Sequence, residues 1–150
     1  MAAQPVLVWS NRQRTVPARQ LRLARVSRAL QNALPLILDA ARKGSVLARL
    51  PEVWFVIVSD ARITDLHDRF LGDPSPTDVI TFQHGEIALS AETARREARA
   101  RGLGVPEEIA RYAVHGLLHL AGWDDGTPSS ASSMRATQEK ILRRACRGVC

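Results

Sequence analysis

The stretch EVWFVIVSD (Glu52 to Asp60) decides the fold class of this 150-residue chain. Its centre, VWFVIV, is too continuously apolar for a strand with one face in water, so we expect a strand that is buried on both faces. Strands of this kind lie in sheets that are covered by helices. Asp60 can cap the helix predicted over ARITDLHDRFLG (61–72), because its carboxylate accepts hydrogen bonds from free backbone N–H groups.

The segments on either side predict further strands and helices in alternation, without a linker. Apolar and β-branched runs predict three more strands, PVLVWSN (5–11), TDVITF (77–82) and GEIALS (85–90), and the short gap between the last two indicates a hairpin or tight turn. Helical spacing and capping residues, including Ser90, predict helices over 18–44, 91–103, 106–122 and 134–146. Pro35 should kink or split the first of these helices. We therefore expect an α+β protein with four strands and about five helices.

Composition limits the classes of protein to which the chain can belong. With 45% hydrophobic residues, a chain of this length can bury a core of its own, so we expect residues 1–150 to form a single domain. The longest apolar runs fall far short of the roughly 20 residues that a membrane span needs. The first residues also lack the pattern of a signal peptide, a basic segment followed by an apolar stretch. We expect a cytoplasmic protein without a membrane partner.

The charge of the chain has two interpretations. The formal net charge is +6, and 19 of the 21 basic residues are arginine. Guanidinium groups match the geometry of phosphates and stack on bases, which favours a nucleic-acid partner. Alternatively, segments such as RREARAR (95–101) are only the solvated face of a helix.

The stretch HGLLHLAGWDD (115–125) has the spacing of a metal site. His115 and His119 are four residues apart, so on a helix their side chains lie on one face, a turn apart. Gly122 can adopt the left-handed conformation that ends a helix and turns the chain back. Asp124 or Asp125 then becomes the third ligand. Three protein ligands leave a position open for water, as in catalytic zinc sites.

Two histidines four residues apart on a helix can also be ordinary surface or core residues that bind no metal. Here the leucines beside them predict partial burial, and buried imidazoles need partners. The pattern H-x3-H-x2-G-x2-D also has the ligand spacing of metzincin zinc enzymes, with aspartate in the third position. In HExxH metalloproteases the residue after the first histidine is the glutamate that acts as general base, whereas this chain has Gly116. The spacing therefore favours a metal site and disfavours peptide hydrolysis.

The same segment resembles the signature H-G-x-L-H-L-x-G-Y-D-H of the YbeY family, bacterial endoribonucleases and rRNA maturation factors that were formerly grouped as an uncharacterised metalloprotein family. TDVITF resembles the family's strand T-D-V-L-S-F, GEIALS resembles the strand that follows it, and VSDARITDLHDRFLG (58–72) resembles the helix before them. Met134 and QEKIL (138–142) fall where members carry a methionine and a similar helix. The resemblance covers residues 53–142.

The resemblance implies an α+β sandwich on a mixed four-stranded sheet, with the metal site on the helix at 106–122 and the turn after it. It implies a metal-dependent, single-strand-specific endoribonuclease that acts through metal-activated water in 3′-end maturation of 16S rRNA and in ribosome quality control. The implied cofactor is one Zn²⁺ per chain. The implied partners are single-stranded RNA, rRNA and the small ribosomal subunit.

Carried over residue by residue, the resemblance gives the metal ligands His115, His119 and, in place of the family's third histidine, Asp125. Asp124 matches the aspartate before the third ligand, and we interpret it as a residue that shapes the turn or supports a ligand, with direct ligation as the alternative. An aspartate ligand cancels one of the two charges of the metal, so bound water should be less acidified. A harder oxygen ligand also widens the choice of metal toward manganese, cobalt or nickel.

The chain departs from the family before the TDV strand. Many members carry an arginine that is associated with RNA cleavage just after an aromatic residue, but here Leu71 follows Phe70. Arg69 is the candidate catalytic residue that takes its place, and the alternative is a solvated helix residue. His67, where many members have asparagine, either lines the cleft or is an exposed helix side chain.

Two other functions fit the same residues. Another metal-dependent hydrolase would keep the metal and act on a different substrate. A non-catalytic ribosome-associated factor would use the metal only to hold the turn at Gly122. The acidic residues Asp73, Asp78 and Glu86 are scattered, so no second cluster of carboxylates predicts a two-metal site.

Overall fold

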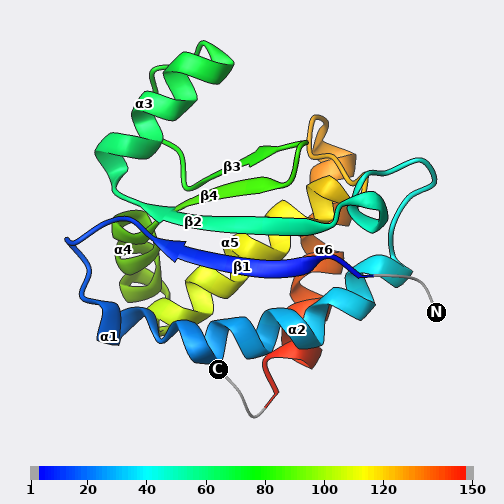
Figure 1. The fold of residues 1–150 in the computed structure, drawn as a ribbon, viewed down its shortest axis with the longest axis horizontal. Coiled ribbons are helices and arrows are strands. Elements are labelled where there is room, and N and C mark those ends of the chain that lie inside the picture. Colours follow the sequence, from blue (N-terminus) through cyan, green and yellow to red (C-terminus); the bar gives the residue numbers. More distant parts are fainter. Residues whose placement is uncertain (1–3, 148–150) are drawn as a thin grey trace.

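The chain forms one mixed sheet in the computed structural model, which describes residues 4–147. Its strands are β1 (Val6–Asn11), β2 (Glu52–Val58), β3 (Val79–Phe82) and β4 (Glu86–Ser90), in the order β1-β2-β4-β3. β1, β2 and β4 are parallel, and β3 is antiparallel to β4. The predicted class, α+β with a mixed four-stranded sheet, is confirmed (Figure 1).

Helices cover the two faces of the sheet unequally. The larger core lies between one face and the helices α1 (Ala18–Leu21), α2 (Leu23–Asp39), α4 (Ala91–Arg101), α5 (Val105–Leu120) and α6 (Pro128–Ala145). Of the helices within residues 4–147, α3 (Asp60–Leu71) alone packs on the other face, where Ile63 meets Val56 and Val58 of β2. A short 3-10 helix, Leu47–Arg49, precedes β2.

The strand β2 is buried as predicted except at its beginning. Phe55 and Ile57 are fully buried in the larger core, while Val56 and Val58 face α3. Trp54, however, is 38% exposed. It points to the same face as Val56, but the small cluster around α3 begins only at Val56, so this end of the strand has no helix over it.

The hairpin between β3 and β4 is confirmed. Phe82 pairs with Glu86, and the N–H of Gly85 donates to the carbonyl of Phe82 at 2.9 Å. Gly85 has a φ of 107°, and a Cβ at this position would lie 3.0 Å from the carbonyl oxygen of Glu52. The turn therefore requires glycine for its backbone conformation and for its close approach to β2.

The predicted helix over 18–44 is wrong in its boundaries. It is broken at Arg22, which has a left-handed φ of 47°, and it ends at Asp39. Pro35 lies inside α2 and does not split it. In one straight helix Leu21 and Val26 would point about 140° apart. The break at Arg22 lets both side chains enter the core, where each is 0% exposed.

Two further predictions at helix ends need correction. The N-cap of α3 is Ser59, whose hydroxyl accepts from the N–H of Arg62, and Asp60 is the first helical residue. α6 begins at Pro128, six residues before the predicted start at Met134, because Thr127 and Ser130 form a capping box. Residues 128–133, which contain four serines, therefore form the first turns of this helix. Ser90 caps α4 as predicted.

Candidate metal centre

Helix α5 presents the two histidines. Pro106 and the acidic residues Glu107 and Glu108 lie in its first turn, where a fixed φ and negative charge favour a helix start. Most of its other side chains are buried between the sheet and the helices α2, α4 and α6. His115 and His119 are the exceptions near its C-terminal end, with side chains 26% and 24% exposed, so the predicted partial burial is confirmed.

The hydrogen bonds of the two imidazoles fix their orientation. The Nδ1 atom of His119 lies 3.0 Å from the carbonyl oxygen of Trp123, which can only accept, so this nitrogen carries the proton. Nδ1 of His115 lies 2.7 Å from Oε1 of Gln138, whose amide nitrogen donates to Glu139. Both Nε2 atoms are therefore left with a free lone pair, which is the form that binds a metal.

The turn after α5 brings the carboxylate to the same place. Gly122 has a φ of 92°, and a Cβ there would lie 3.0 Å from Cβ of Arg42, so the turn and its packing both require glycine. The indole N–H of Trp123 donates to the carbonyl of Ala40 at 2.9 Å, and the guanidinium of Arg42 lies 4.1 Å from the centre of the indole ring. These contacts hold the turn against the end of α2 and deliver Asp125 to the histidines.

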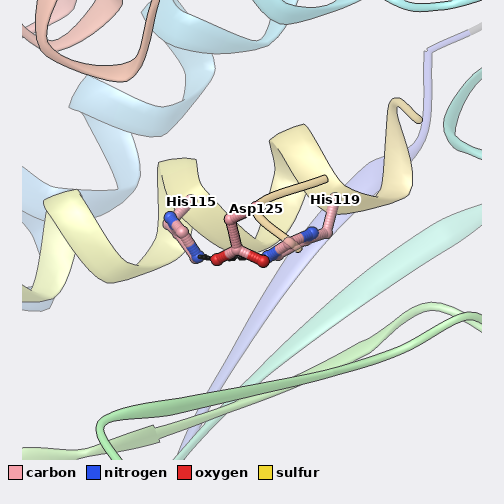
Figure 2. Close-up of side chains that lie close together, drawn as sticks. All are labelled: His115, His119 and Asp125. Carbon is pink, nitrogen blue, oxygen red and sulfur yellow. Dashed lines mark hydrogen bonds and ion pairs between the residues drawn. The ribbon is translucent and has the colours of Figure 1, made fainter. Parts of the chain in front are cut away.

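The three predicted ligands converge. Nε2 of His115 lies 3.1 Å from Nε2 of His119, and Oδ2 of Asp125 lies 3.5 Å and 3.7 Å from these two atoms. Figure 2 shows the three side chains pointing toward one another, the histidines from α5 and the aspartate from the following turn. One ligand atom from each residue lies within 4.8 Å of the others, so the group could hold a metal ion.

The donor set suits a transition-metal ion. Ligand atoms about 2.0–2.1 Å from a tetrahedral Zn²⁺ lie about 3.3 Å apart, close to the separations of the three donors here. Two imidazole lone pairs that face each other at 3.1 Å repel unless a cation or a proton lies between them. Burial lowers the pKa of His119, and the neighbouring imidazole of His115 lowers it further. A neutral imidazole is thereby favoured, and a metal requires it.

Asp124 takes the turn-shaping position. Its Oδ1 accepts from the backbone N–H of Gly126 at 3.2 Å, and this hydrogen bond is the main cause of its lowered pKa. It is not part of the group of three converging ligands. Of the two adjacent aspartates, only Asp125 reaches the histidines.

A pocket of about 320 Å³ opens between the ligands and β3. It is lined by all three ligands, by Leu71 and by residues 77–81 and Gln83. Gly116 packs against β4, where an added Cβ would lie 2.8 Å from Ile87. The position that holds the general base in HExxH proteases thus has no room for a side chain.

Arg69 and His67 lie apart from the ligands. The guanidinium of Arg69 is 3.7 Å from the carboxylate of Asp65 on the same helix, and Arg69 does not line the pocket. A role for Arg69 in cleavage stays a prediction. Nδ1 of His67 lies 2.9 Å from the carbonyl of Ser75, so this side chain, 15% exposed, holds the loop before β3.

Two groups that orient the ligands were not predicted. Gln138 belongs to α6 and supports His115, while the backbone carbonyl of Trp123 supports His119. The QEKIL run that contains Gln138 resembles the family's segment, but no spacing along the chain links it to His115. Every residue has a backbone carbonyl, so the residue type at position 123 does not predict the contact with His119. Only the packing of α6 against α5 brings Gln138 to the site.

The fold and the ligands together define a class of protein: an α+β protein with a candidate His-His-Asp metal centre on the C-terminal end of a core helix. The family profile described as endoribonuclease YbeY matches residues 11–145. The chain therefore belongs to the YbeY endoribonuclease family, and family membership supports an endoribonuclease role.

Individual relatives agree with this assignment. The endoribonuclease YbeY of Moorella thermoacetica is 35% identical over 136 residues, which cover 78% of this chain and 87% of the relative. That of Thermobifida fusca is 31% identical over 144 residues, or 85% and 86% of the two chains. A solution structure of a Thermotoga maritima protein has the same fold, with a TM-score of 0.59 at 22% identity over 95% of this chain and 91% of the other. None of the helices within residues 4–147 is both long and apolar enough to cross a bilayer.

Proposed function

We propose that the chain is a metal-dependent endoribonuclease specific for single-stranded RNA, and that its metal is held by His115, His119 and Asp125. The observation that carries the proposal is the convergence of these three donors within 4.8 Å beside an open pocket. Family membership supplies the reaction class, since the relatives are named endoribonucleases. Zn²⁺, one per chain, is the proposed ion, because two imidazoles and one carboxylate are ligands that zinc prefers.

The residues of the site have separate tasks in this proposal. When bound, a divalent metal supplies acidified water and neutralises charge that develops on the phosphoryl group. Gln138 and the carbonyl of Trp123 keep the two imidazoles in the ligating tautomer. Asp124 keeps the turn closed through Gly126, so that Asp125 stays in reach of the histidines. The pocket beside the three side chains is open to solvent, so they stay accessible to a substrate.

We further propose that the RNA is the 3′ end of 16S rRNA in the small ribosomal subunit, with a role in ribosome quality control. This finer assignment rests on the resemblance of HGLLHLAGWDD and TDVITF to the family's segments. It implies work in the cytoplasm, where ribosomes mature. We also infer that residues 1–150 act as one metallohydrolase domain.

The central experiment compares the purified protein with His115→Ala on labelled single-stranded RNA, double-stranded RNA and casein, each with and without a chelator. We expect cleavage of single-stranded RNA alone, its loss with chelator, and its loss in His115→Ala at an unchanged circular dichroism spectrum. His84→Ala is the matched control, because His84 is exposed and lies outside the ligand group. Cleavage by metal-free His115→Ala at the parent rate would refute the proposal.

The other outcomes identify the alternatives. Hydrolysis of casein with intact RNA would indicate another metal-dependent hydrolase. Ribosome association without any hydrolysis would indicate a non-catalytic factor, and in that case His119→Ala should lower the melting temperature while binding follows folding alone.

The third ligand is tested by metal content. Mass spectrometry on protein purified without chelator should find about one zinc per chain in the parent and in Asp124→Ala, and far less in Asp125→Ala. Equal metal in all three proteins would contradict ligation by Asp125.

A further inference from the structure

The pockets on the α6 side of the metal centre contain arginines, whereas the pocket toward β3 contains none. A pocket of about 330 Å³ is lined by Arg101, Arg111 and Arg135 together with His115. A smaller one of about 160 Å³ is lined by Arg135 with both His115 and Asp125. The pocket toward β3 has Leu71 in the slot where the family resemblance implies an arginine, and Asp78 is its only charged residue besides Asp125. Among these three pockets, the arginines therefore all lie on the α6 side.

Two of these arginines are already neutralised. Arg111 donates a hydrogen bond to Glu108 and forms a bidentate ion pair with Glu139. Arg101 lies 3.6 Å from the buried carboxylate of Glu108 and 4.0 Å from Glu97. Their guanidinium groups pair with carboxylates of α4, α5 and α6, so these ion pairs largely balance their positive charge.

Arg135 differs from both. It is exposed, and no ion pair within residues 4–147 includes it. It lies three residues before Gln138, and since residues three apart share a helix face, Arg135 is on the face of α6 that supports His115. It lines both pockets that contain His115 on this side. A free guanidinium is thus placed beside the ligands by the same helix that orients one of them.

The charge of the ligand set makes a nearby cation useful. Asp125 carries one negative charge into a set where three histidines would carry none, so a bound divalent ion keeps a net charge of +1. A phosphodiester that undergoes hydrolysis develops additional negative charge. Among the residues that the structure describes, no lysine or arginine lines the pocket toward β3 to meet it, whereas guanidinium groups bind phosphate oxygens in a bidentate geometry.

We propose that Arg135 binds a phosphate of the RNA beside the metal centre and so supplies, from α6, the positive charge that Leu71 cannot supply. The RNA then lies across the α6 side of the three ligands, with one of its phosphates between Arg135 and these ligands. This proposal rests on the proposed function for its substrate class, and it names the residue that positions that substrate.

The test measures RNA binding and cleavage separately for Arg135→Ala, Arg135→Lys and Arg144→Ala. Arg144 is the matched control, an exposed arginine of α6 that lines neither pocket. Binding is followed by fluorescence anisotropy of a labelled single-stranded 2′-O-methyl oligoribonucleotide, which resists cleavage, over a series of salt concentrations with zinc-loaded protein. Cleavage is followed with the unmodified RNA, and melting temperature reports folding.

We expect Arg135→Ala to weaken binding and to lower the slope of log affinity against log salt by about 0.7, the value for one phosphate contact on a single strand. Its kcat/KM should fall by about 10- to 100-fold, as for loss of one charge-assisted hydrogen bond. Arg135→Lys should keep the salt slope and recover part of the rate, because it keeps the charge without the planar fork. Arg144→Ala should match the parent, and all melting temperatures should agree.

The two proposals fail in different ways. If the parent cleaves RNA and Arg135→Ala binds and cleaves like Arg144→Ala, the role of Arg135 is overturned and the proposed function stands. If binding depends on Arg135 but the parent never cleaves, the phosphate contact stands and the proposed function falls. If Arg135→Ala loses binding only together with its melting temperature, the residue is structural and the proposal is overturned.

Discussion

The Nδ1 atom of His115 on α5 lies 2.7 Å from Oε1 of Gln138 on α6, 23 positions later in the chain. The side chain of Gln138 is almost fully buried, and its amide nitrogen donates to Glu139, so its oxygen is held toward the imidazole. A ligand supported in this way needs no rearrangement to bind a metal.

Replacing Gln138 should therefore weaken metal binding without removing a ligand. We expect Gln138→Leu to lower zinc affinity by about 10- to 100-fold, the usual effect of losing a group that orders a ligating histidine. Gln138→Glu, which still accepts the hydrogen bond, should lose much less. Competition titration against a zinc-binding dye measures both, and equal affinities of Gln138→Leu and the parent would contradict the role.

Gly116 should not tolerate even one added methyl group. A Cβ there would lie 2.8 Å from two side-chain atoms of Ile87 on β4, so Gly116→Ala must displace the Ile87 side chain or push α5 away from the sheet. We expect a loss of about 1–3 kcal/mol in the free energy of unfolding, measured by urea denaturation. Ile87→Ala makes room, so the double variant should be more stable than the sum of the single effects predicts. Additive effects would show that the contact is unimportant.

The buried carboxylate of Glu108 should make Arg111 essential for stability. Glu108 is 0% exposed and its nearest cation is Arg111, at 2.5 Å. Arg111→Met leaves a buried charge with only the longer contact to Arg101, and should cost about 3 kcal/mol. Arg143→Met, at an exposed position of the neighbouring helix, is the control and should change stability by less than about 0.5 kcal/mol. Similar denaturation midpoints for the two variants would refute the argument.

Asp60 should make the stability of the chain sensitive to acid. Burial raises the pKa of its carboxyl, but hydrogen bonds from Arg96, Ser90 and Thr93 outweigh this effect and lower it. A folded pKa below the unfolded value means that the unfolded chain binds more protons between the two, so stability is present above the ordinary pKa of 3.8 and is lost as pH falls through the lowered value.

Asp60→Asn removes that titration. Its free energy of unfolding should be lower than that of the parent near neutral pH, and the difference should shrink below about pH 4. Urea denaturation at a series of pH values measures this. A difference that stays constant over the whole range would show that Asp60 does not contribute through its charge.

Much of the candidate metal centre could be predicted because its residues are close in sequence. Helical geometry places His115 and His119 on one face, and Gly122 predicts the turn that brings Asp125 back toward them. The resemblance favours Asp125 over Asp124 as the ligand, and in the structure Asp125 lies beside the histidines while Asp124 accepts a hydrogen bond from Gly126. Spacing alone left both aspartates open.

The parts that were missed depend on contacts between distant segments. The break at Arg22 follows from the need to bury both Leu21 and Val26, and nothing in the local sequence distinguishes it from a continuous helix. The early start of α6 depends on the reciprocal hydrogen bonds of Thr127 and Ser130, two residue types that are equally common in loops.

The hydrogen bond from the indole of Trp123 to the carbonyl of Ala40 spans 83 positions of the chain. The segment after α2 therefore holds the turn that carries Asp125. Proteolytic cleavage within residues 40–46 would disrupt the candidate metal centre without removing any of its three side chains. Conversely, an ion bound by the three side chains would stabilise the turn and with it the contact between Trp123 and Ala40. A metal-loaded protein would therefore resist unfolding at residues 40–46 as well, where the ion itself would make no contact.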